Sequence, residues 1–149
     1  MSDAAALDLD LVGAWRLERF VFADEEGGEH FPLGQSPRGF VTVTPDHYLS
    51  LSFMADGRPP FAGNDLLGGS AAERAAAAAS YVAFGGPCRV EGEELVVEVE
   101  AAFHPNWAGT TQRRRFRLEG ERLTLKTTRT ITVDGRALTG RAELRRAGA

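Results

Sequence analysis

Short runs of alternating apolar and polar residues, separated by tight turns, fill the second half of the chain. The run 95–103 alternates apolar with acidic residues, and the run 110–119 alternates basic with apolar ones. This period of two is typical of β-strands, because successive side chains point to opposite faces of a sheet. The turns between the runs contain Gly92, Gly120 and Gly135, and such residues favour hairpins. This half of the chain is therefore predicted to be a series of antiparallel strands.

The same reading over the whole chain predicts eight strands in one domain, residues 1–149. Sequential antiparallel strands with tight turns can remove their open edges by closing into a barrel. Eight strands enclose room for one small ligand. We therefore predict an all-β, eight-stranded antiparallel up-and-down barrel. Its strands are expected at 11–22, 40–44, 48–54, 88–90, 95–103, 110–119, 122–133 and 137–145.

One segment interrupts the strand pattern and is predicted to be a loop followed by a helix at about 70–84. Ser70 and Glu73 have the spacing of a capping box, and the alanines between 71 and 79 favour helix. Two glycines and Pro87 are expected to end the helix. We expect the whole insertion, 54–86, to form a lid over the mouth of the barrel.

Alternation also predicts which side chains point into the barrel. Phe116 and Leu118 select the inner face of their strand, which carries Gln112 and Arg114 inward as well. The same argument on the next strand places Arg129 inward. A buried arginine is costly unless it is paired. Three alternatives stay open for these arginines: a carboxylate of the barrel or helix, exposure at the mouth, or an anionic group on a ligand.

The turn between runs 95–103 and 110–119 holds most of the remaining candidate residues. His104 is the best candidate acid–base group because its reference pKa lies near neutrality, and Asn106 adjoins it. Tyr48 is a second candidate proton shuttle. Four aromatic residues are candidates to line the pocket, namely Phe103, Trp107, Phe116 and Tyr81.

Composition and residue spacing limit which metals, cofactors and partners are expected. The three histidines lack zinc-ligand spacing, so we expect no metal site, and we expect no cofactor, although one histidine could ligate a haem. A net charge of −4 gives no general attraction to nucleic acid or to anionic membranes. The single cysteine, an acidic start and no long apolar run predict a cytoplasmic protein. Oligomeric state is not predicted.

With these motifs in view, the chain resembles the lipocalin-like domain family, small intracellular relatives of the lipocalins with calycin-type barrels. The opening strand contains the Gly13-Ala-Trp15 pattern, Thr44-Pro-Asp-His-Tyr48 matches the second hairpin, and the segment 104–114 resembles the family's most recognisable motif. The resemblance implies that Trp15 closes the base of the barrel, with Arg141 or Arg145 covering it.

The resemblance implies a fold more firmly than an activity. The leading hypothesis is a protein that binds a small, mostly apolar molecule carrying an anionic or polar group, oriented by Gln112, Arg114 and Arg129. One alternative is a cofactor-free cyclase, isomerase or dehydratase acting on a polyketide-like substrate, with His104 or Tyr48 as proton shuttle. Another is an interaction module whose barrel is filled by its own side chains. The sequence does not decide whether the protein is an enzyme.

Overall fold

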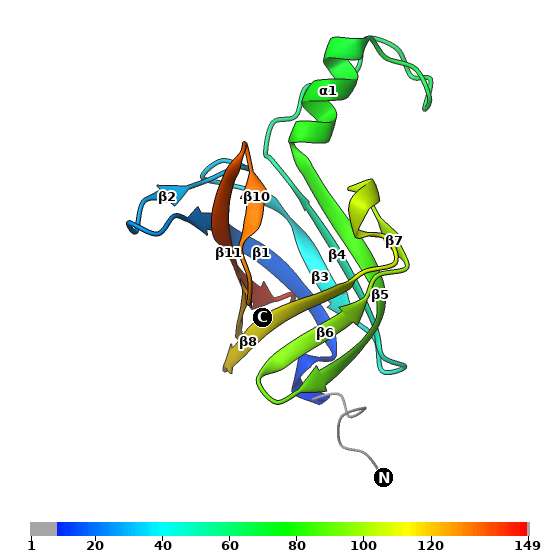
Figure 1. Ribbon diagram of the computed structural model, residues 1–149. Helices are drawn as coiled ribbons and strands as arrows, with labels where there is room; N and C mark the ends of the chain where they lie inside the picture. The colour runs from blue at the N-terminus through cyan, green and yellow to red at the C-terminus, as the bar shows by residue number, and fades with distance from the viewer. Residues whose placement is uncertain (1–8, 149) are drawn as a thin grey trace.

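The computed structural model of the protein describes residues 9–148, whose strands form one sheet that closes on itself (Figure 1). The closed ring runs β1-β3-β4-β5-β6-β8-β9-β11, all antiparallel, and pairing of β11 with β1 completes it. The predicted eight-stranded antiparallel barrel with one helix is thus confirmed. Its elements are η2 (Leu9–Leu11), β1 (Gly13–Ala23), β2 (Glu29–His30), β3 (Arg38–Val43), β4 (Tyr48–Met54), α1 (Ala71–Ala79), β5 (Tyr81–Glu91), β6 (Glu94–Glu98), β7 (Ala101–Ala102), η3 (Pro105–Trp107), β8 (Thr111–Glu119), β9 (Arg122–Thr127), β10 (Ile131–Val133) and β11 (Arg136–Arg146).

Two predicted strands are each divided in the structure. The run 95–103 becomes β6 and the two-residue β7, and the run 122–133 becomes β9 and β10. Outside the ring, β10 pairs with β11, β7 pairs with β5, and β2 pairs with β1. These short strands all lie toward the end of the barrel that carries α1 (Figure 1).

The helix begins where the capping box predicts and ends earlier than predicted. Ser70 accepts a hydrogen bond from the backbone N–H of Glu73, and the Glu73 side chain accepts one from the N–H of Ser70. The prediction that the helix reaches residue 84 is wrong, because α1 ends at Ala79 and β5 begins at Tyr81.

The glycines expected to stop the helix instead let neighbouring strands approach β5 closely. A Cβ at Gly86 would lie 2.0 Å from the backbone oxygen of Glu98, and one at Gly85 would lie 2.6 Å from that of Leu49. Glycine inside a strand often marks such an approach. The two glycines before Pro87 therefore mark a close approach between strands, whereas the sequence pattern assigned them to the end of a helix.

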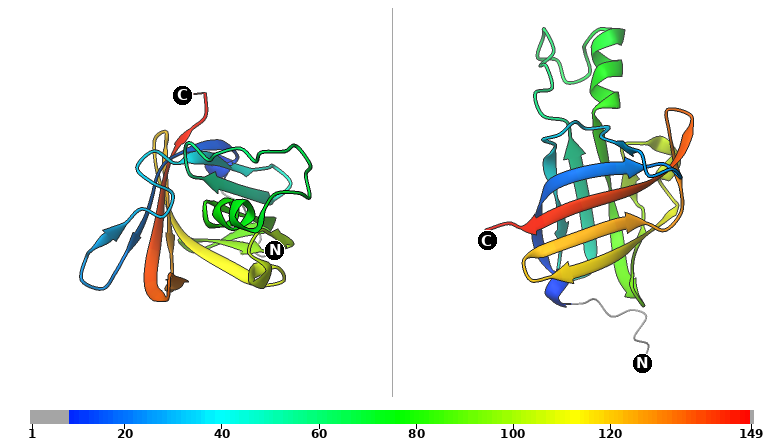
Figure 2. Two further views of the ribbon diagram at one scale, coloured as in Figure 1. Left: turned by 90° about the horizontal axis from the view of Figure 1, so that it is seen from above. Right: turned by 90° about the vertical axis from the view of Figure 1, so that its left-hand side faces the viewer.

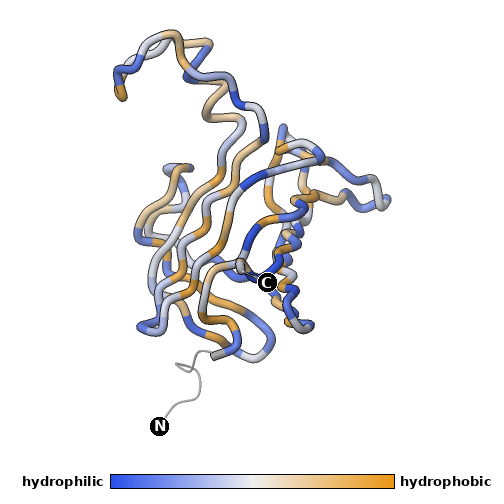
Figure 3. The backbone as a smooth tube through the Cα atoms, turned by 180° about the vertical axis from the view of Figure 1, so that it is seen from behind, coloured by the Kyte–Doolittle hydropathy of each residue, from blue (hydrophilic) through white to orange (hydrophobic). Residues whose placement is uncertain are grey.

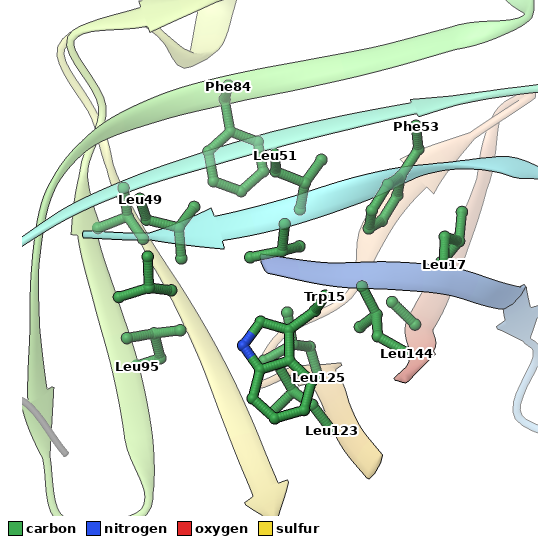
Figure 4. Close-up of a cluster of buried hydrophobic side chains, with 14 of the residues drawn as sticks. Trp15, Leu17, Leu49, Leu51, Phe53, Phe84, Leu95, Leu123, Leu125 and Leu144 are labelled. Carbon is green, nitrogen blue, oxygen red and sulfur yellow. The ribbon is translucent and has the colours of Figure 1, made fainter. Parts of the chain in front are cut away.

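Apolar side chains from around the ring fill one end of the barrel (Figure 4). Hydrophobic and hydrophilic residues alternate along many of the strands, as the tube in Figure 3 shows. Trp15 is fully buried, and its indole N–H donates to the carbonyl oxygen of Leu11 at 2.9 Å. The tryptophan and η2 thus close this end.

The arginine that covers Trp15 is Arg146, rather than Arg141 or Arg145. The Cζ atom of Arg146 lies 4.1 Å from the centroid of the Trp15 ring, and the two residues face each other across the β1–β11 ladder. The even-numbered residues Leu138, Ala142 and Leu144 are buried on this strand. The inner face therefore passes through Arg146, one residue beyond the predicted end of the strand.

The insertion stands at the opposite end of the barrel (Figure 2). No residue of α1 is buried, and Leu66 and Leu67 in the preceding loop are 93% and 82% exposed. The insertion stands at the mouth, where Ala75, Ala78 and Ala79 of α1 line the cavity, and its action as a lid stays a prediction. No helix within residues 9–148 combines the length and the apolar character that crossing a bilayer requires.

Candidate functional site

A cavity of about 1420 Å³ occupies the end of the barrel that Trp15 does not fill. Its floor is apolar, with Leu51, Phe53 and Leu125 shared between the cavity wall and the core. Three alanines of α1, Ala75, Ala78 and Ala79, form part of the rim. Pockets that hold small molecules usually measure about 300–1,000 Å³, so this one has room for a ligand of several rings. The cavity contradicts the interpretation that the barrel is filled by its own side chains.

Aromatic rings line two sides of the cavity in edge-to-face contact. Phe20 meets Phe22 and Phe53 with centroid distances of 5.1 and 5.3 Å. On the other side Phe84 meets Trp107 at 5.5 Å and an interplanar angle of 86°. Rings arranged in this way present both faces and edges, which suits a flat apolar ligand.

Strand β8 carries two polar side chains of the cavity wall, Gln112 and Arg114. Its alternate residues are exposed, while Gln112, Arg114, Phe116 and Leu118 are half-buried. The pairing of Phe116 with Leu125 and of Leu118 with Leu123 places these residues on the inner face. The predicted inward orientation of Gln112 and Arg114 is confirmed, and both line the cavity.

Arg114 has no ionic partner among residues 9–148. No carboxylate of this part of the chain lies within 4.0 Å of its guanidinium. Its Nη1 donates to the side-chain oxygen of Gln112 at 3.2 Å and to the backbone oxygen of Arg113 at 3.0 Å. The guanidinium also lies over Phe84, with 5.5 Å between Cζ and the ring centroid. Of the three alternatives for this arginine, a pairing with a carboxylate of the barrel or helix is therefore not found among residues 9–148.

Burial has an electrostatic consequence for Arg114. Loss of hydration lowers the pKa of its guanidinium from its ordinary value to about 10. Because that pKa still lies well above neutrality, the group is charged at physiological pH. A cation held in this way attracts any anion or strong hydrogen-bond acceptor that enters the cavity.

A short hydrogen-bond chain holds the Arg114 head group in place. The amide nitrogen of Gln112 donates to the Thr110 hydroxyl at 3.1 Å, and that hydroxyl donates to the backbone oxygen of Trp107 at 2.7 Å. The chain therefore ties the arginine to the loop that carries Trp107. Such second-layer contacts reduce the freedom a binding group must lose when ligand arrives.

Arg129, the other candidate arginine, was predicted to point inward, but it does not point into the core. It lies in the connection between β9 and β10, is exposed, and borders the mouth of the cavity. The prediction failed because β9 ends at Thr127, so strict alternation does not continue to residue 129.

The outward residues of β8 pair with acids on the barrel surface. Arg113 contacts Glu91 at 3.1 Å and Glu94 at 3.0 Å, and Arg117 contacts Glu119 at 3.1 Å. These ion pairs are solvent-exposed and worth little individually. They account for two arginines of this strand without any partner molecule.

Alternation predicted that Phe103 shares the inner face of Leu95, and this prediction is wrong. The pairing of Phe84 with Ala102 places Ala102 inward, and Phe103 is 47% exposed at the rim. An irregularity after β6 causes the change, because Val99 bonds to Thr110 and Gly109 while Glu100 bonds to Gly85. A bulge of this kind reverses the parity of the residues that follow.

The turn residues gather at the mouth. Trp107 packs against the core and borders the cavity, and His104 meets it edge-on with 5.6 Å between ring centroids. His104 and Asn106 are exposed and line the mouth. Tyr81 also borders the cavity, contacts Phe103 at 5.7 Å, and exchanges a hydrogen bond with Ser52.

Two predicted site residues lie elsewhere. Tyr48 is on the outer surface, where its hydroxyl donates to the Glu100 carboxylate at 3.0 Å. This hydrogen bond raises the pKa of Tyr48. Phe116 faces inward but packs into the core rather than lining the cavity. A role for Tyr48 as a proton shuttle inside the barrel is therefore not supported by its position.

Sequence reasoning missed the ring beneath Arg114. Phe84 was assigned to the helix, so its place on β5 and its inward direction could not be inferred. Phe20 and Phe22 also line the cavity, because the register shift between Leu17 and Arg19 departs from the alternation that starts at Trp15. Within residues 9–148 no group of three or more histidine, cysteine, aspartate or glutamate side chains could hold a metal ion.

Residues 12–145 match the model of a family described as the lipocalin-like domain. The 4'-hydroxy-3'-methoxypropiophenone carrier protein ppsC of Aspergillus oryzae is 32% identical over 95 residues, which cover 58% of this chain and 86% of that protein. An uncharacterized protein from Bacteroides eggerthii, with a crystal structure, is similar over 92% of this chain and 99% of its own. That similarity has 12% identity and a TM-score of 0.44.

Proposed function

The chain belongs to the lipocalin-like domain family, and from this premise we propose that it binds a small, mostly apolar molecule and orients it by one polar or anionic group. The observation that carries this proposal is Arg114, a charged guanidinium on the wall of a large cavity, with no carboxylate within 4.0 Å among the described residues. A buried cation without a partner is costly, and proteins retain such groups mainly at functional sites.

The shape of the cavity supports an apolar ligand. Its floor and sides include many phenylalanine, leucine and alanine side chains, so transfer of a ligand from water buries apolar surface of both the ligand and the protein. The rings of Phe84 and Trp107 flank the polar end of the wall. A ligand with one flat apolar body and one oxygen acceptor matches this distribution.

We assign the orienting role to Arg114 and Gln112. Arginine offers five N–H donors. In Arg114, the Nη1 nitrogen already donates to the Gln112 side-chain oxygen and to the Arg113 carbonyl oxygen. The remaining donors are available to a ligand oxygen. Four residues at the mouth, Phe103, Asn106, Trp107 and Tyr81, would contact the outer part of the ligand, with Arg129 as an exposed second cation.

The named relative supports a carrier role for aromatic ketones. Its name describes a carrier of 4'-hydroxy-3'-methoxypropiophenone, a small aromatic ring with a hydroxyl, a methoxy and a keto oxygen. Those features fit the distribution of polar and apolar groups here. We therefore propose hydroxyaryl ketones as a ligand class, with the ring in the cavity and one oxygen at Arg114.

Binding can be tested directly by calorimetry and by native mass spectrometry. Titration with 4'-hydroxy-3'-methoxypropiophenone should show saturable binding at one site, and Arg114→Met should weaken it at least tenfold, about 1.4 kcal/mol. Arg117→Met is the matched control, because Arg117 is 75% exposed on the opposite face of the same strand. Failure of the wild-type protein to bind this compound, related aryl ketones or any co-purified apolar molecule would contradict the proposal.

A second candidate function is cofactor-free catalysis on an enolisable substrate, favoured by one observation. His104 borders the same cavity as Arg114, which supplies an acid–base group and an oxyanion partner together. Deuterium incorporation at the carbon next to a bound ketone would detect it. A His104→Ala variant that exchanges deuterium as fast as the wild type would remove His104 from this role.

We also propose the cytoplasm as the working compartment. The only cysteine, Cys88, is free and buried, so the fold uses no disulfide. Cell fractionation of the tagged protein checks this, and recovery in an extracellular fraction would contradict it.

A further inference from the structure

The charged side chains that line the cavity are all basic. They are Arg113, Arg114, Arg129 and Arg141, joined by the titratable His104, and no aspartate or glutamate within residues 9–148 lines the wall. The chain as a whole has 21 acidic and 17 basic residues, so chance would favour acids. The cavity therefore has the opposite electrostatic character from the chain.

Two of these four arginines are paired with acids outside the cavity. Arg113 contacts Glu91 and Glu94, and Arg141 contacts Glu143 at 2.8 Å and Glu29 at 3.6 Å. Arg129 is exposed to solvent at the mouth. Arg114 is half-buried, as Arg141 is, but its neighbours among residues 9–148 supply no negative charge.

Every element packed around Arg114 presents a neutral side chain. Leu95 of β6 and Thr127 of β9 are its cross-strand partners, Phe84 of β5 lies under its guanidinium, and Gln112 precedes it on its own inner face. The positive field at this point of the cavity is thus uncompensated. Burial strengthens that field, because the local dielectric constant is lower than that of water.

A neutral hydroxyl on the ligand would be poorly matched to this point. Arginine can only donate hydrogen bonds, so it cannot receive the proton of a phenol. The nearby acceptor, the Gln112 side-chain oxygen, already accepts from Arg114 at 3.2 Å. An ionised oxygen accepts from the guanidinium instead, and such charge-assisted bonds are about twice as strong as neutral ones.

We propose that the cavity binds weakly acidic phenols as their anions, so that binding removes the phenolic proton. The proposal rests on the proposed function and adds the charge state of the ligand. On binding, the phenolic O–H bond breaks heterolytically, the electron pair stays on oxygen, and the proton passes to the buffer. The aromatic wall formed by Phe20, Phe53, Phe84 and Trp107 accommodates the ring.

The proposal fixes the direction of the pH dependence. An opposite charge nearby lowers the pKa of an acid, so the bound phenol ionises at a lower pH than the free one. Between those two pKa values, the apparent affinity rises about tenfold for each pH unit. Below the bound pKa and above the free pKa, the affinity is level.

The test uses 4-nitrophenol, whose anion is yellow, as a probe in the presence of excess protein. Its spectrum is followed through a pH titration with and without the protein. We expect the bound probe to ionise at least one pH unit below the free probe, a shift equivalent to about 1.4 kcal/mol. A midpoint that is unchanged or raised would overturn the proposal.

Variants assign the shift to Arg114. Arg114→Met should abolish the downward shift, Arg114→Lys should keep part of it because the charge remains, and Arg117→Met should keep all of it. Circular dichroism checks that each variant is folded. A full shift in folded Arg114→Met would also overturn the proposal. The wild-type titration decides the question even where a variant does not fold.

A second probe separates this inference from the proposed function. 4-Nitroanisole has the same ring but no acidic proton. We expect it to bind more weakly than 4-nitrophenol and with no pH dependence between the two pKa values. Equal, pH-independent binding of both probes overturns the inference and leaves the apolar-ligand function standing, whereas binding of neither overturns both.

Discussion

The guanidinium of Arg114 lies over the ring of Phe84, with 5.5 Å between Cζ and the ring centroid. Trp107 meets the same ring edge-on, with 5.5 Å between centroids. Strand β5 and the consecutive elements η3 and β8 thus place a cation and two aromatic rings at one point of the cavity wall. A cation held over an aromatic face gains about 0.5–2 kcal/mol. That gain offsets part of the cost of burying Arg114 and keeps the group in position for a ligand.

Replacement of Arg114 should stabilise the ligand-free protein while weakening binding. Lowering of the Arg114 pKa to about 10 corresponds to a cost of about 3 kcal/mol at neutral pH. The lost contacts with Gln112 and Phe84 reduce the net gain, so we expect Arg114→Met to raise the free energy of unfolding by about 1–3 kcal/mol. Urea denaturation at pH 7 measures this difference.

The same variant should show a defined pH dependence. Below pH 10 the arginine is charged in both the folded and the unfolded protein, so its full cost is present. As the pH rises above about 10, the folded form loses its proton first and the cost falls. The stability difference between Arg114→Met and the wild type should therefore shrink above pH 10. A difference that grows there, or a destabilised Arg114→Met at pH 7, would contradict the assigned cost.

Ligand binding should be reported by Trp107 and not by Trp15. Trp107 borders the cavity, whereas Trp15 is fully buried at the closed end. We expect decanoate, which is transparent and joins an apolar chain to one carboxylate, to shift the fluorescence of the wild type. Trp107→Phe should lose the shift, and Trp15→Phe, which keeps Trp107 as the remaining tryptophan, should retain it. The reverse pattern would place the ligand at the closed end.

The barrel was predictable because its evidence is local. Alternation and glycine turns define hairpins within short windows, and the inward direction of Gln112 and Arg114 follows from Phe116 and Leu118 on the same strand. The errors arise where the strand is interrupted. Phe103 follows a bulge, and Arg129 follows the end of β9, so alternation could not be extended to either.

The site itself was less predictable than the fold, because it depends on contacts between distant segments. Assignment of Phe84 to a helix hid the ring under Arg114. Tyr48 was a reasonable proton shuttle by residue type, yet its strand register turns it toward Glu100 on the surface. The chemistry of a side chain can be read from the sequence at one position. Its contacts in the folded protein depend on how strands such as β5 and β8 are placed in the ring.

Glycine at position 86 is a strict requirement of the barrel. A Cβ there would lie 2.0 Å from the Glu98 backbone oxygen, so Gly86→Ala must push two strands apart. We expect a loss of about 1–3 kcal/mol or more in the free energy of unfolding, measured by urea denaturation. Gly63→Ala is the control, because a Cβ at Gly63 meets nothing within 4 Å. Equal stability of the two variants would show that β5 has more room than the structure gives it.

The last prediction concerns whether α1 closes over a bound ligand. None of its residues is buried, so little apolar contact holds it against the barrel, although its first turn is capped by Ser70 and Glu73. Segments with few buried contacts open locally at low free-energy cost, and we expect the amides of α1 to exchange hydrogen faster than those of β4 and β5. Ala75, Ala78 and Ala79 already line the rim, so a ligand that reaches the rim would add apolar contact to this face. Binding of 4-nitrophenol should therefore slow exchange in residues 71–79 while β3, on the other side of β4, stays unchanged as the internal control. Mass spectrometry of exchanged peptides measures both.

The lid prediction would be wrong if α1 were as protected as the strands before ligand is added and unchanged afterwards. The helix would then be a fixed part of the rim and would not act as a lid.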